Sequence, residues 1–170
     1  MPDSNLFTVN LVTPERILLT GLAAEVILRT GDGDATFLAG HTPLVGSVEP
    51  GVIRVQRAEG DEERVAVHGG FVQVEQHVPL DEGEDTGQTG TRVTLLIGVA
   101  ELAEEIDTER ARNALAAAEA QVAALGGASG RGTGADDAEP DAELVEAEAA
   151  LLRAQVRLET VDATAAATNA

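Results

Sequence analysis

The chain has 170 residues, 44% of them hydrophobic, and a formal net charge of -19 at pH 7. Its length fits one domain or two small ones. Because the sequence contains no cysteine, disulfide bonds and thiolate metal sites are excluded. The excess of carboxylates repels nucleic acid and anionic lipid surfaces. We therefore expect no nucleic-acid partner, and docking through basic, neutral or apolar surfaces. No apolar run approaches the roughly 20 residues of a membrane span, so we expect no direct membrane insertion.

Residues 1–100 show the alternation of apolar and polar residues that is typical of β-strands. In the first run, Phe7, Val9 and Leu11 are separated by polar residues, which is a period of two. Further apolar runs follow at residues 26–28, 53–55, 65–67, 72–74 and 93–97. Glycine, aspartate and proline residues mark turns between the runs. Many short strands at close spacing predict an antiparallel sandwich or barrel. The acidic segment 79–91, rich in glycine and threonine, is predicted to be a long surface loop between two strands.

The period changes to that of a helix near residue 107. Asp107 has the position and side chain of an N-cap, since its carboxylate can accept from free N–H groups of the first turn. Spacings of 3 and 4 then give one apolar stripe, which consists of Ala111, Leu115, Ala118, Val122 and Leu125. Gly126-Gly127 is expected to end this helix.

A second helix is predicted after Pro140, a residue that suits the first turn of a helix. Its apolar stripe consists of Leu144, Ala147, Leu151, Ala154, Leu158 and Val161. Two matching stripes predict an antiparallel helical hairpin. The loop between the helices, about residues 126–139, is rich in glycine and acidic residues, and we expect it to be disordered. Since about half of each stripe is alanine, the helix interface is expected to be thin.

No residue pattern in the chain forms a convincing active site or metal site. His41, His68 and His77 have spacings that match no common metal site, so no metal ligands are assigned. Paired aspartate and glutamate residues exist, but they fall mostly in turns. A hydrolase would need a nucleophile with a base, or converging carboxylates. We therefore expect a protein that is not itself an enzyme.

Three segments, in this order and spacing, carry a resemblance to a known family. Residues 38–51 read LAGHTPLVGSVEPG, residues 68–74 read HGGFVQV, and residues 106–111 read IDTERA. Together they resemble the ε subunit of bacterial F-type ATP synthases. The resemblance implies a β-sandwich N-terminal domain over residues 1–100, followed by a C-terminal antiparallel helical hairpin over residues 107–170. It implies a non-catalytic rotor subunit of the central stalk, which couples ion-driven rotation to ATP synthesis.

The resemblance also implies partners and a location. The sandwich would bind the γ subunit of the central stalk and the ring of c subunits, with Asp34 and His41 as candidate contacts to that ring. The hairpin would regulate ATP hydrolysis, and it would reach the catalytic β and α subunits when its helices extend. The chain would lie at the cytoplasmic face of the bacterial plasma membrane, peripherally, through the complex.

Some members of this family bind ATP at the helices, and the pattern is present here. Ile106, Asp107, Arg110 and Ala111 match its fixed positions, and Glu101 matches an acidic position of the same site. On the second helix, the matching residues are Arg153 and Arg157. Their i, i+4 spacing puts both guanidinium groups on one helical face, where they can hold phosphate oxygens. One further basic position of the family is Ala117 here. We therefore expect weak regulatory ATP binding and no required cofactor.

Each of these features also has an interpretation that requires neither a ligand nor an ATP synthase partner. Asp107 can be an N-cap alone and Arg110 a surface residue, while the stretch around His41 can be an ordinary turn. On that reading, the chain is an acidic β-sandwich binding module whose coiled-coil tail recruits an unrelated partner. Neighbouring genes for α, β and γ subunits, or co-purification with those subunits, would decide against it.

Overall fold

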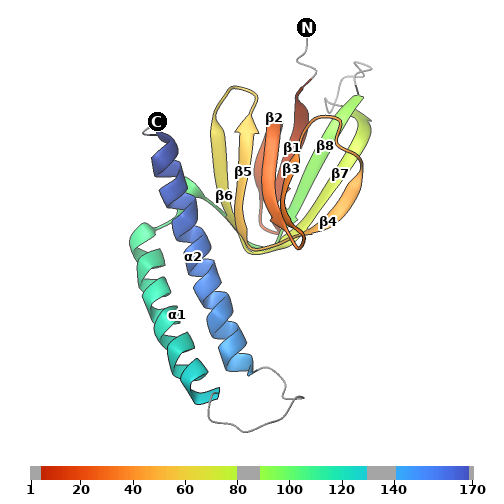
Figure 1. Cartoon of the computed structure of the whole chain (residues 1–170). Helices are drawn as coiled ribbons and strands as arrows, with labels where there is room; N and C mark the ends of the chain where they lie inside the picture. Colours follow the sequence, from red (N-terminus) through yellow and green to blue (C-terminus); the bar gives the residue numbers. More distant parts are fainter. Residues whose placement is uncertain (1–4, 80–88, 130–140, 169–170) are drawn as a thin grey trace. The chain divides into compact units, whose positions relative to one another are not determined.

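A computed structural model describes residues 5–79, 89–129 and 141–168, and it divides into two compact units, residues 1–104 and 105–170 (Figure 1). The first unit contains the strands, which are β1 (Phe7–Val12), β2 (Ile17–Thr30), β3 (Gly33–Phe37), β4 (Leu44–Val48), β5 (Gly51–Arg57), β6 (Glu62–Val67), β7 (Gly70–Pro79), β8 (Thr89–Ile97) and β9 (Ala100–Leu102). The second contains helices α1 (Thr108–Ser129) and α2 (Ala142–Thr168). A 3-10 turn, Ala103–Glu105, lies between the last strand and α1. The predicted β-sandwich followed by a helical hairpin is confirmed.

The described strands form one sheet that folds over into two layers (Figure 1). Its order is β4-β7-β8-β1-β2-β5-β6-β9, and β3 pairs with β2 beside this path. Strands β1 and β8 run parallel, and the other paired strands run antiparallel. The sequence pattern predicts an antiparallel sandwich or barrel, and the parallel β1–β8 pair is an exception to that prediction.

Strand β2 belongs to both layers of the sandwich. Its first half, from Ile17 to Ala23, pairs with β1, and its second half pairs with β3 and β5. The register to β5 shifts between Ala23 and Glu25, which is a β-bulge. Because one extra residue reverses the alternation, the buried side chains change from Leu19 and Ala23 to Val26 and Leu28. The bulge therefore keeps both halves of β2 facing the same core.

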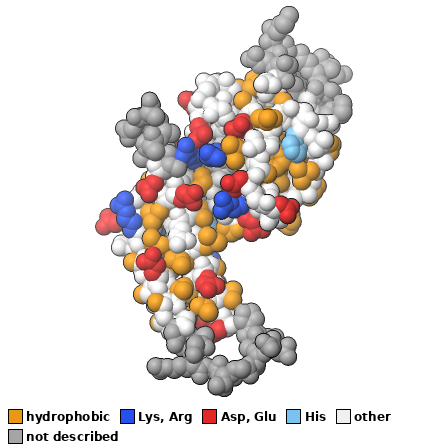
Figure 2. Space-filling model, viewed as in Figure 1, with side chains coloured by type: hydrophobic (Ala, Val, Ile, Leu, Met, Phe, Trp, Pro, Cys, Tyr) orange, Lys and Arg blue, Asp and Glu red, His pale blue; other side chains and the backbone are white. Residues whose placement is uncertain are grey.

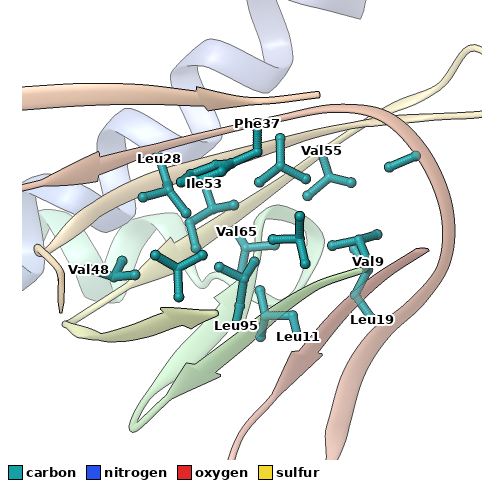
Figure 3. Packing of buried hydrophobic residues seen from close by; sticks show 14 of the residues in the cluster. Val9, Leu11, Leu19, Leu28, Phe37, Val48, Ile53, Val55, Val65 and Leu95 are labelled. Carbon is teal, nitrogen blue, oxygen red and sulfur yellow. The ribbon is translucent and has the colours of Figure 1, made fainter. Parts of the chain in front are cut away.

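The core of the sandwich lies between the two layers (Figure 3). It is aliphatic apart from Phe7 and Phe37, which are 0% and 1% exposed. The alternation along β1 and β8 is regular, since Val9, Leu11 and Leu95 are fully buried. Burial of such a side chain contributes about 1.5–3 kcal/mol. A row of these residues on each strand is what holds the layers together.

One part of the predicted surface loop over residues 79–91 is wrong. Pro79 belongs to β7 and pairs with Thr89, and residues 89–91 belong to β8. Thr91 is only 3% exposed. These strand ends were not predicted because the segment is rich in glycine and threonine and lacks an apolar alternation. Strand pairing rests on backbone hydrogen bonds, which do not require apolar side chains. Residues 80–88 of the predicted loop lie outside the described residues.

The two helices form the predicted antiparallel hairpin and bury the predicted stripes. Four of its buried residues, two on each helix, are alanines, namely Ala111, Ala118, Ala147 and Ala154. The stripe prediction missed two buried residues of α2, Val156 and Thr160, whose hydroxyl donates to the Val156 carbonyl at 2.7 Å. A polar side chain that bonds to its own helix backbone can be buried without another partner.

Both ends of the linker between the helices differ from the prediction. Helix α1 continues through Gly126-Gly127 and ends at Ser129, so residues 126–129 are helical. Glycine costs only about 1 kcal/mol in a helix, which an existing helix tolerates near its end. Helix α2 begins at Ala142 and is capped by Asp141, whose carboxylate accepts from the Glu143 N–H at 3.0 Å. Pro140 and residues 130–139 lie outside the described residues.

Two neighbouring leucines of β8 allow a matched test of the core. Leu95 is 0% exposed, whereas Leu96 is 48% exposed on the other face. We expect Leu95→Ala to lower the free energy of unfolding by about 2–5 kcal/mol, because it leaves a cavity. Leu96→Ala should lower it by less than about 1 kcal/mol. Denaturant unfolding of the full chain measures both, and equal losses would contradict this assignment of the two faces.

Candidate functional site

The connection between β3 and β4, residues 38–43, is a structured loop. The His41 N–H donates to the Leu38 carbonyl at 3.1 Å, which closes a four-residue turn. Gly40 occupies the third position of that turn with φ of 81°, a left-handed conformation that glycine adopts without strain. The half-buried His41 ring lies 4.9 Å from the ring of Phe37, measured between centroids. His41 is therefore tied to the core through Phe37.

Two side chains from other strands hold the backbone of this loop. The Gly40 N–H donates to the Thr91 hydroxyl at 2.7 Å. Gln76 Nε2 donates to the carbonyls of Gly40 and His41, both at 2.8 Å. Neither Gln76 nor Thr91 was predictable as a loop contact, since these hydrogen bonds join residues more than 30 positions apart in the sequence. The only signal was a polar residue at the end of an apolar alternation.

Asp34 lies at the opposite end of β3 from His41. It pairs with Arg29 across β2 and β3, and Asp34 Oδ1 accepts from Arg29 Nε at 2.9 Å. The hydrogen bond and charge of Arg29 hold the pKa of the exposed Asp34 carboxyl below its ordinary value. Phe37, at the other end of β3, is three residue steps or about 10 Å along the strand from Asp34. The structure therefore does not bring the two candidate ring contacts, Asp34 and His41, into one cluster.

The outer face of the sandwich carries an apolar row that the sequence analysis missed. Cross-strand pairing joins Phe71 of β7 to Leu96 of β8, Leu96 to Val12 of β1, and Val12 to Ile17 of β2. Phe71 is 60% exposed, Leu96 48% and Ile17 65%, and Val12 is half-buried. We call these four residues the apolar outer row. Hydrophobic side chains also reach the surface over β4 and β7, where Val45 is 72% exposed (Figure 2).

The candidate nucleotide residues of the first helix have distinct local roles. Asp107 caps α1, since its Oδ1 accepts from the Arg110 N–H at 2.9 Å and its carbonyl accepts from the Ala111 N–H at 2.9 Å. Ile106 and Ala111 are buried, whereas the Arg110 side chain is exposed. The motif thus fixes the first turn of α1 and leaves one guanidinium group in solvent.

The candidate arginines of the second helix lie on either side of the middle of α2. Arg153 and Arg157 are both half-buried. Arg153 Nη2 forms an ion pair with Glu146 Oε1 at 2.7 Å. The Glu146 side chain is 73% exposed, and such a surface pair contributes little stability, typically about 0–1 kcal/mol. The pair therefore leaves Arg153 able to exchange Glu146 for another anion.

Glu101 belongs to the sandwich unit rather than to the hairpin. It lies on β9 opposite Ala66, and its Oε1 is 3.9 Å from Nε2 of His68. The His68 side chain is 8% exposed and that of Glu101 is 29% exposed. Glu101 and the other candidate nucleotide residues are thus carried by different units.

Neither a metal site nor a membrane span is present in the described parts of the chain. No group of three or more His, Asp or Glu residues among residues 5–79, 89–129 and 141–168 could hold a metal ion. Within those ranges, neither helix is long and apolar enough to cross a membrane.

Comparison with known proteins gives consistent results for both units. A family model described as "ATP synthase, Delta/Epsilon chain, beta-sandwich domain" matches residues 6–78. The ATP synthase epsilon chain of Thermobifida fusca is 44% identical over 133 residues, which cover 77% of this chain and 86% of that one. The epsilon chain of Moorella thermoacetica is 36% identical over 155 residues, which cover 91% and 96%.

A chain in the structure of the Euglena gracilis mitochondrial ATP synthase, described as OSCP/F1/c-ring in rotational state 1, is also similar. It has a TM-score of 0.56 and 25% identity, and the match covers 95% of this chain and 81% of that chain. Similarity therefore extends beyond the sandwich into the helices.

The Arg29–Asp34 pair predicts a titration that can be measured. Since the pKa of Asp34 is lowered in the folded chain, the pair stabilises the fold above the unfolded-state pKa, and this contribution is lost as pH falls through the lowered folded-state pKa. We expect Arg29→Gln to raise the Asp34 pKa towards its ordinary value of 3.8. NMR titration of the carboxyl carbon measures the shift, with Arg57→Gln as the control. An unchanged Asp34 midpoint would contradict the pairing.

Proposed function

The chain belongs to the family of ATP synthase epsilon chains, and from this membership we propose how its two units act in the complex. It is a non-catalytic subunit of the central stalk of an F-type ATP synthase. We propose that the sandwich docks on the γ subunit and on the ring of c subunits, and that the hairpin regulates ATP hydrolysis. The observation that carries the docking proposal is the apolar outer row.

The apolar outer row has the properties of a protein-docking surface. It crosses four adjacent strands of a rigid sheet, and its three exposed members are large apolar residues. Exposed contiguous apolar surface on a soluble chain marks an interaction site. Phe71 supplies the kind of aromatic anchor that dominates binding energy at interfaces. We propose that this row binds the γ subunit, because a subunit of the rotating stalk needs a permanent attachment to that stalk.

The loop that carries His41 is proposed to contact the c ring. A contact that transmits torque needs a rigid backbone, and this loop donates one hydrogen bond to Thr91 and accepts two from Gln76. Asp34 lies at the other end of β3, so it would belong to a second contact. Through this docking the chain would lie at the cytoplasmic face of the bacterial plasma membrane.

The hairpin is proposed to be a regulatory element with two states. Four of its buried residues are alanines, and each buried alanine contributes much less than the roughly 1.5–3 kcal/mol of a large aliphatic side chain. The helices can therefore separate at modest cost, and a ligand that binds one state shifts the balance. When extended, α2 would reach the catalytic β and α subunits.

ATP is the proposed ligand of the compact hairpin, and no cofactor is required. Arg110, Arg153 and Arg157 provide three guanidinium groups on an antiparallel pair of helices. Guanidinium groups bind phosphate oxygens through paired hydrogen bonds. Binding must displace Glu146 from Arg153, and it must overcome the many carboxylates of this acidic chain. We therefore propose weak affinity.

Docking on γ can be tested through the apolar outer row. We expect the double variant Phe71→Ser, Leu96→Ser to weaken co-purification with γ at least about tenfold, because each lost apolar contact removes about 1.5–3 kcal/mol. Leu22→Ser is the matched control, since Leu22 is 44% exposed on β2 outside the row. Both variants should retain the far-ultraviolet circular dichroism of the parent chain. Unchanged recovery of γ with the double variant would reject this face as the docking site.

ATP binding can be tested by calorimetry on the full chain. We expect weak, saturable heat with millimolar ATP, and a loss of about tenfold in affinity for Arg153→Gln, because hydrogen bonds to charged groups contribute about 1.5–3 kcal/mol. Arg16→Gln, a charge-matched change in the sandwich, should leave the affinity unchanged. Heat no greater than that of dilution would show that the nucleotide motif serves only as a helix cap here.

A further inference from the structure

The end of the sandwich core where residues 38–43 lie is closed by polar side chains instead of apolar ones. On β7, Gln76 continues the inward-facing alternation of Val72 and Val74, which are 0% and 2% exposed. On β8, Thr91 precedes the inward-facing Val93 and is 3% exposed. Both inner rows therefore change from apolar to polar at the same end of the core.

A register shift brings the two polar residues to the same loop. The pairing of β7 with β8 shifts between Glu75 and Val78, so the bulge contains Gln76, and Thr91 lies opposite it on β8. Bulges redirect a side chain at the end of a ladder. The Gln76 amide then reaches two carbonyls, and the Thr91 hydroxyl reaches an N–H group.

These contacts provide hydrogen-bond partners for backbone groups of residues 40 and 41, which lie in a turn and outside the strand ladders. The Gly40 N–H, the Gly40 carbonyl and the His41 carbonyl would each lose their partner if the inner rows remained apolar to their ends. Gly40 is exposed and His41 is half-buried, so water could replace these partners, but water would not hold the three backbone groups at fixed positions as the side chains of Gln76 and Thr91 do. The Phe37 ring under His41 gives the loop a third attachment, from the core itself.

We propose that Gln76 and Thr91 are positioning residues that fix the backbone of residues 40–41 and thereby present His41 to the partner of this loop. The inference that this partner is the c ring rests on the proposed function above, whereas the fixing of the loop does not. Neither residue touches the partner. They act through the backbone that carries His41.

The first measurement is amide hydrogen exchange at Gly40 in the full chain. Thr91→Val keeps the shape of the side chain and removes the acceptor, so exchange at Gly40 should accelerate about tenfold or more. Thr91→Ser keeps the hydroxyl and should restore protection. Gln76→Met should move the His41 ring resonances away from their positions beside Phe37. Thr36→Val, an exposed change on β3, is the control for both readouts.

The second measurement is ATP-driven proton pumping per ATP hydrolysed, in membrane vesicles that contain the assembled synthase. Faster Gly40 exchange together with a lower pumping ratio, both reversed by Thr91→Ser, supports the positioning role and the ring contact. Faster exchange at an unchanged pumping ratio supports the positioning role and overturns the ring contact. Exchange that is unchanged at Gly40, or that rises equally along the whole sandwich, overturns the positioning role.

Discussion

The sandwich depends on a single bulged strand that belongs to both of its layers. If β2 lacked the register shift after Ala23, its second half would turn Val26 and Leu28 towards solvent and the two layers could not share a core. The stability of the unit, and the positions of its outer face and its loops, depend on the shared core that this bulge makes possible. Of the three phenylalanines of the chain only Phe7 and Phe37 are buried, so the shared core is otherwise built from aliphatic side chains such as Leu11, Leu28 and Ile53.

The surfaces proposed to work in the complex are made by the same strands that make the core. Leu95 points inward and Leu96 outward, and on β7 Phe71 is exposed beside the buried Val72. Alternation therefore places a docking face at a fixed distance from a rigid interior. Where the inner rows reach the end of the core, polar residues replace apolar ones and hold a loop. Stability and partner contact are thus separable by substitutions at adjacent positions.

Regular alternation made most of the sandwich predictable, and the helical stripes did the same for the hairpin. The remaining strands were not predictable because their patterns are irregular. The bulge interrupts the alternation of the 14-residue β2, so only the apolar run at residues 26–28 was recognisable. Strand β4 was missed because glycine and proline occur in and around it. For the candidate sites, Asp107 was predictable as a cap because it bonds within its own turn. Gln76 and Thr91 were not, since their role depends on a tertiary contact that no local pattern encodes.

The most direct test of the account is ATP hydrolysis by the purified synthase complex that carries either the full chain or a version ending after Glu105. The shorter version retains the whole sandwich unit, residues 1–104, and lacks both helices. If the sandwich docks the stalk and the hairpin regulates, both versions co-purify with the complex and removal of the hairpin raises the hydrolysis rate. Failure of the shorter version to co-purify, or equal rates for the two complexes, would contradict this division of roles.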